Sequence, residues 1–159
     1  MFAGLAWFGL RSLGAFGGRR LVMATISPLL QDIKDARIEA IRGHRPYRLN
    51  FTDLASAGRY CIEAYIPEPG DWWQCADMAT SPHLWRQKVE RVLQPQPKVI
   101  LGSSTIVYIH PEGWFTDRWR VPEEISFLPT TRYSFTVADV SMTVMLNGQE
   151  IRTVEEPLR

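Results

Sequence analysis

Residues 132–154, RYSFTVADVSMTVMLNGQEIRTV, decide the fold class of this chain. Apolar residues alternate with polar ones from Tyr133 to Val137 and again from Val140 to Leu146. A period of two is typical of strands that place one face on a hydrophobic core. We therefore predict that the chain ends in β-structure.

Two short interruptions punctuate this stretch. Ala138-Asp139 shifts the phase of the alternation, which predicts a β-bulge inside one strand. Asn147-Gly148 is a favoured pair for a two-residue type I′ turn. Residues 149–154 are therefore expected to return as the second strand of a terminal β-hairpin.

Two helix starts lie further upstream. Ser27 is a good N-cap and Pro28 suits the first helical position, so we predict a helix over residues 27–42 that Gly43 ends. Ser81-Pro82 repeats this pattern and predicts a second helix over residues 81–93.

Strand signals fill most of the remaining chain. Alternation predicts a strand over residues 59–66, after a polar connection at 44–57. A longer strand is predicted over 98–109, with a bulge or hairpin at Gly102-Ser103-Ser104. The expected fold class is α+β: two helices packed on a mixed or antiparallel sheet that ends in a β-hairpin, with an N-terminal arm.

The charge of the chain is unevenly placed. The 159 residues include 18 basic and 17 acidic side chains, a net charge of +1. Residues 1–31 contain three arginines and no acidic residue, which leaves 15 basic and 17 acidic residues in 32–159. This distribution excludes a uniformly basic nucleic-acid binder and an acidic disordered chain, and we expect no direct nucleic-acid recognition.

Residues 1–22, MFAGLAWFGLRSLGAFGGRRLV, form an apolar extension that contains arginine. It suits a docking arm, a mitochondrial targeting segment, or an extension before a native start at Met23. A membrane span is disfavoured because Arg11 lies in its middle, although contact with a membrane surface through this extension stays open. Residues 23–159 then form a single α+β domain. The expected contact residues of the arm are Phe2, Trp7, Phe8, Leu10, Leu13 and Phe16.

Tryptophan-rich loops follow both predicted strands, 59–66 and 98–109. If the two strands pair in parallel, both loops leave the sheet at one edge and their aromatic residues form one patch. Exposed aromatic patches mark contact surfaces; the alternative is that these residues close a small core. Carboxylates beside the aromatic residues also suit a glycan site. The expected patch residues are Trp72, Trp73, Trp114, Phe115 and Trp119, rimmed by Glu68, Asp71, Glu112 and Asp117.

The sequence contains no motif that names a reaction. His44, His83 and His110 have no partner at metal-ligand spacing, and Cys61 and Cys75 lie outside any nucleophile or zinc signature. We therefore predict no catalytic, cofactor-binding or metal-binding residue.

The order of the predicted elements resembles that of small tail-completion and tail-terminator proteins of tailed bacteriophages. The elements concerned are the helices 27–42 and 81–93 and the strands 59–66, 98–109 and 132–146. The resemblance spans about residues 23–146 and implies a non-enzymatic virion protein of the head–tail junction or tail, assembled in the host cytoplasm. Its partners would be copies of itself, in a ring or another homo-oligomer, and other structural subunits.

Two alternatives to the virion protein stay open. One is an accessory subunit of an organellar or membrane-associated complex, mitochondrial in the organellar case, with residues 1–22 as anchor or presequence. The other is a glycan-binding or glycan-active module that uses the tryptophan loops.

Overall fold

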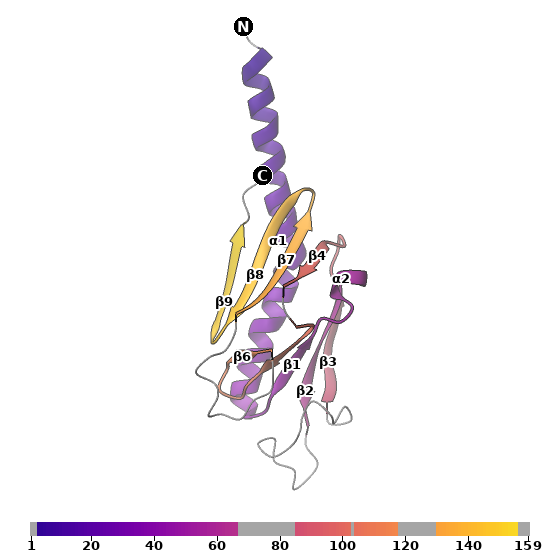
Figure 1. The fold of residues 1–159 in the computed structure, drawn as a ribbon, viewed down its shortest axis with the longest axis vertical. Coiled ribbons are helices and arrows are strands. Elements are labelled where there is room, and N and C mark those ends of the chain that lie inside the picture. The colour runs from indigo at the N-terminus through magenta and orange to yellow at the C-terminus, as the bar shows by residue number, and fades with distance from the viewer. Residues whose placement is uncertain (1–2, 67–84, 103, 118–129, 156–159) are drawn as a thin grey trace.

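The computed structural model describes residues 3–66, 85–102, 104–117 and 130–155, with residues 3–16 described by their backbone. One long helix, α1 (Ala3–Gly43), begins the fold and extends well beyond the sheets at its N-terminal end (Figure 1). The predicted helix 27–42 is the C-terminal part of α1.

The predicted helix start at Ser27-Pro28 is wrong, because α1 continues through both residues. Proline inside a helix removes one backbone hydrogen bond. Both residues are exposed, so the unpaired carbonyl one turn earlier lies on the water-facing side of the helix. The helix also crosses the expected boundary between residues 22 and 23 without a break.

Two antiparallel sheets complete the fold, which is α+β with strand as the larger part. The first sheet has the order β3-β2-β1-β5-β6 and the second has the order β4-β7-β8-β9. A short helix, α2 (Leu54–Ala57), follows β1. The strands are β1 (Tyr47–Asn50), β2 (Arg59–Tyr65), β3 (Trp85–Val92), β4 (Lys98–Leu101), β5 (Ile106–Ile109), β6 (Phe115–Thr116), β7 (Thr131–Val137), β8 (Val140–Asn147) and β9 (Glu150–Glu155).

Three predicted elements need correction. The described part of the expected helix 81–93 is the edge strand β3, paired with β2. The connection 44–57 contains β1, at the centre of the first sheet. The expected strand 98–109 is two strands, β4 and β5, that belong to different sheets. One long helix across two sheets therefore replaces two helices on one sheet.

Both terminal turns are two-residue hairpin loops. Val137 pairs with Val140, so Ala138 and Asp139 form a turn with φ of 49° and 63°, and the predicted bulge is wrong. Two positive φ angles are the pattern of a type I′ turn, which reverses the chain.

The terminal hairpin is confirmed as β8–β9, but its loop lies one residue later than predicted. Asn147 pairs with Glu150, which makes Gly148 and Gln149 the loop residues. Gly148 has a φ of 54°, and a glycine with positive φ at the first loop position is the type II′ pattern.

The main hydrophobic core of the described residues lies between α1 and the two sheets. The helix contacts β1 and β5 of the first sheet and β7 and β8 of the second. It contributes a face of buried side chains spaced three or four residues apart, which is the amphipathic pattern of a core-facing helix. These residues are Val22, Ile26, Leu29, Ile33, Ala36 and Ala40. The two sheets meet directly where the Phe115 N–H donates to the Gly148 carbonyl.

Candidate functional site

Residues 3–17 of α1, called the projecting half below, extend away from a contact at Gly18. A Cβ atom on Gly18 would lie 2.5 Å from Val140 Cγ2, whereas a Cβ on Gly17 would meet nothing within 4 Å. Gly18 is therefore the point at which the tip of the β7–β8 hairpin touches the helix backbone. Residues 3–17 continue the helix away from this contact (Figure 1).

The predicted contact residues of the arm fall on this projecting half. Trp7, Phe8, Leu10, Leu13 and Phe16 lie on the α1 backbone before Gly18, while Phe2 lies outside the described residues. With a rise of 1.5 Å per residue, residues 3–17 span roughly 20 Å. The sequence here is apolar on most sides and carries no carboxylate.

A buried carboxylate holds the other half of α1 to the first sheet. Asp32 is 7% exposed; it accepts a hydrogen bond of 2.7 Å from the Tyr60 hydroxyl of β2 and one of 2.5 Å from Arg91 Nε of β3. Burial, and then the bond to Asp32, raises the pKa of Tyr60, which stays a donor. The cluster ties the helix to an inner and an edge strand at once.

The outer face of the first sheet carries an aromatic cluster. Tyr65 and Trp85 have ring centroids 5.4 Å apart, and Trp85 and Tyr108 have centroids 5.9 Å apart. The Arg48 guanidinium lies 4.6 Å from the Trp85 ring centroid and forms an ion pair with Glu63, its cross-strand neighbour.

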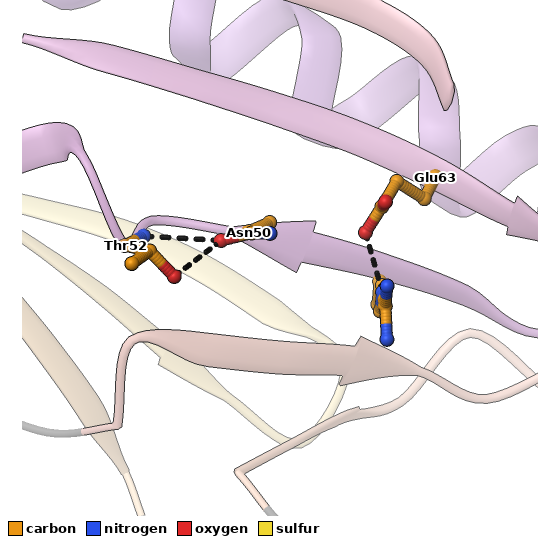
Figure 2. Close-up of polar contacts among 4 residues, drawn as sticks. Asn50, Thr52 and Glu63 are labelled. Atoms are coloured by element: carbon orange, nitrogen blue, oxygen red, sulfur yellow. Dashed lines mark hydrogen bonds and ion pairs between the residues drawn. The ribbon is translucent and has the colours of Figure 1, made fainter. Parts of the chain in front are cut away.

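Asn50, further along β1, accepts hydrogen bonds from the backbone N–H and the hydroxyl of Thr52 and so fixes the chain as it leaves the strand (Figure 2). Figure 2 also shows Glu63 of β2 with the dashed line that marks its bond from Arg48 of β1.

The expected tryptophan patch required the strands 59–66 and 98–109 to pair in parallel, which the described strands β2 and β5 do not do. β2 and β5 do not pair with each other, but both are antiparallel to β1 and therefore have the same direction. The C-terminal ends of β2 and β5 therefore lie at the same end of the first sheet.

The residues of that patch have different environments. Phe115 is 1% exposed and belongs to the core, so it is not a surface contact. Trp114 is half-buried and stacks on His110, with ring centroids 5.8 Å apart. Trp72, Trp73 and Trp119 lie outside the described residues.

The described residues do not assemble an obvious reaction centre. Among them, no three His, Cys, Asp or Glu side chains are grouped to hold a metal ion. Burial, followed by the nearby Glu63 and Glu90, raises the pKa of the half-buried Cys61 thiol, which disfavours the reactive thiolate. Cys75 lies outside the described part of the chain.

Sequence reasoning missed one buried cluster and one surface groove. One is the Asp32–Tyr60–Arg91 cluster, because residues so far apart in sequence give no local signal. The other is a groove between α1 and β9, lined by Lys34, Arg37, Ile38, Ile41 and Ile151. Exposed isoleucines on a predicted amphipathic helix were the available sign of it.

Within the described residues, no helix has both the length and the apolar character needed to cross a membrane. The chain matches no protein-family model, no curated protein and no solved structure.

Proposed function

We propose that this protein is a non-enzymatic structural subunit of a multi-chain assembly, joined to its neighbours by the projecting half of α1. The observation that carries the proposal is the extension of α1 past Gly18 as an apolar helix without carboxylates. A helix that is apolar on most sides needs covering, and isolated helices of this length are marginal in water. Neighbouring copies of the same helix supply that cover.

The shape of the subunit favours a particular arrangement. The β-rich body is attached to one half of α1, so bundling the other halves leaves the bodies outside (Figure 1). A repeated contact of this kind closes into a ring or continues as a filament. We therefore favour a pilus-like filament or ring with helices at its centre and β-sheet bodies on its surface.

The bacteriophage virion and the membrane-associated complex are the two settings considered for such a subunit. The phage setting was inferred from an order with a second helix at 81–93, and residues 85–92 form a strand instead. A projecting helix on a β-rich body suits the accessory subunit, with residues 1–22 as the element that joins it to the neighbouring subunits of its complex. We favour this second setting for that reason.

Light scattering after size exclusion tests the proposal on the full chain and on a chain that lacks residues 1–17. The full chain should form large oligomers visible as rings or fibres by electron microscopy. The shortened chain should be monomeric with unchanged circular dichroism, because the deletion ends where the Gly18 contact begins. A monomeric full chain, or equal oligomers from both chains, would overturn the proposal.

A pair of point variants controls for the deletion. Leu13→Glu places a charge on the projecting half and should abolish the oligomer. Ile100→Glu places the same charge on β4, where Ile100 is 58% exposed, and should leave the oligomer intact. Monomers that bind phosphatidylglycerol vesicles through residues 1–17 without oligomerising would contradict the proposal and favour a simple membrane anchor.

A further inference from the structure

A groove of about 440 Å³ lies between the C-terminal half of α1 and the edge strand β9. Ile38 and Ile41, on the helix side, are 46% and 42% exposed, and the partly buried Ile151 faces them from the strand. Three branched apolar side chains thus line a concave surface that the described residues leave open. Apolar surfaces of this kind are typical of sites for protein segments.

The groove lining is basic. Lys34 and Arg37 line it, and none of the described carboxylates does. Arg37 Nε donates to the Gly113 carbonyl at 2.9 Å, which fixes that guanidinium, and Lys34 forms no ion pair with another described residue.

The carboxylates of β9 already have partners. Glu155 pairs with Arg19 and Glu150 pairs with Arg152. The charge left in the groove is therefore positive, which favours an acidic occupant.

The β9 strand offers hydrogen bonds to such an occupant. In the described residues β9 pairs with β8 on one side and is the last strand of its sheet. Asn147 and Glu150 close the hairpin as a hydrogen-bonded pair, and hydrogen-bonded pairs alternate along an antiparallel ladder. The N–H and C=O groups of Ile151, Thr153 and Glu155 consequently face the open edge.

We propose that this groove binds an extended acidic segment of a partner protein, which adds to β9 as a fifth strand. Its backbone would pair with the open edge of β9, and its alternate apolar side chains would pack against Ile38 and Ile41. Strand addition takes affinity from the backbone and specificity from pockets for alternate side chains. Carboxylates on the segment would lie near Lys34 and Arg37. This site is separate from the projecting helix, so its test is independent of the proposed assembly.

Binding of a defined peptide to the full chain tests the proposal. The probe is a fluorescein-labelled peptide of sequence EIEIEIE, with KIKIKIK as the charge-reversed control, and fluorescence anisotropy is the measurement. The acidic peptide should bind at least tenfold more tightly than the basic one. Equal affinities, tighter binding of the basic peptide, or no binding of the acidic one would overturn the proposal.

Variants of the chain test backbone pairing and charge attraction separately. Thr153→Pro removes one N–H from the open edge without removing a bond to β8, and proline is tolerated on such an edge. Lys34→Glu reverses a charge in the groove. Both should weaken binding of EIEIEIE at least tenfold, whereas Lys88→Glu, an exposed lysine on β3, should leave it unchanged.

Hydrogen exchange keeps the test decisive if Thr153→Pro folds poorly. Bound EIEIEIE should slow exchange of the Ile151, Thr153 and Glu155 amides of the unmodified chain. These amides face the open edge and have no partner strand within the described ranges. Unchanged exchange at all three under saturating peptide would overturn strand addition.

Discussion

Gly18 sets the distance between α1 and the β7–β8 hairpin. A methyl group on Gly18 would overlap Val140, and the Ala138 carbonyl oxygen would lie 3.4 Å away. Gly17, its neighbour, faces open space. The two glycines therefore form a matched pair in which the same substitution has opposite consequences.

Gly18→Ala should lower the free energy of unfolding by about 1–2 kcal/mol, because overpacking exceeds the gain in helix propensity. Gly17→Ala should raise it by up to about 1 kcal/mol through propensity alone. Urea denaturation of both variants measures the difference. Equal effects of the two substitutions would mean that the hairpin tip does not press on the helix.

His110 makes the stability of the body depend on pH. Burial lowers the pKa of its imidazole from 6.5, and this exceeds the opposite effect of Glu112. The unfolded chain therefore takes up a proton below about pH 6.5 that the folded chain resists, so stability is present above that pH and declines as the pH falls. His110 Nδ1 accepts the Glu112 N–H at 3.1 Å.

His110→Asn keeps an acceptor near this position and removes the titration. Urea unfolding between pH 7.5 and pH 5 should show a steeper loss of stability in the unmodified protein than in the variant. Parallel curves for the two proteins would assign the acid sensitivity to other groups.

At the scale of elements, Asp32 connects a helix to two strands. Asp32→Ala should cost roughly 2–3 kcal/mol of unfolding free energy, because the buried Tyr60 hydroxyl loses its acceptor and Arg91 loses its partner. Asp35→Ala removes an exposed carboxylate from the same helix and should change stability by less than about 0.5 kcal/mol. Thermal unfolding of the two variants provides the comparison, and similar melting temperatures would deny Asp32 its anchoring role.

The sequence predicted elements well where one face meets the core. β2, β7, β8 and the C-terminal half of α1 have apolar residues at regular spacing, and each was expected near its observed place. β3 failed because it is an edge strand: Trp85 is buried, Val89 is partly buried and the other residues are exposed. Its apolar residues Trp85, Val89 and Val92 have the spacing i, i+4, i+7 of a helix, so the local pattern favoured the wrong element.

The prediction at Ala138-Asp139 was wrong for a different reason. Ala138-Asp139 has none of the glycine or asparagine that favours positive φ, so its two-residue turn could not be recognised from residue preference. The pairing across it, from Val137 to Val140 outward, stabilises this conformation instead. Tertiary structure here determines what local preference does not.

At the scale of the whole molecule, the sequence indicated an arm but not its relation to the body. The charge division at residue 31 and the apolar stretch 1–22 suggested two parts, whereas α1 joins them as one continuous helix. The groove at Ile38 and Ile41 could not be predicted from the sequence either, because it depends on where β9 packs relative to α1. The projecting helix and the groove therefore both result from how the elements are arranged in three dimensions.

That topology also orders events on the ribosome. The helix α1 is synthesised before β7 and β8, which cover much of its apolar face. The nascent chain must therefore carry an uncovered helix face until residues 131–147 have emerged, and exposed surface of this kind invites aggregation. Packing of this helix face is therefore completed only after β8 has been synthesised.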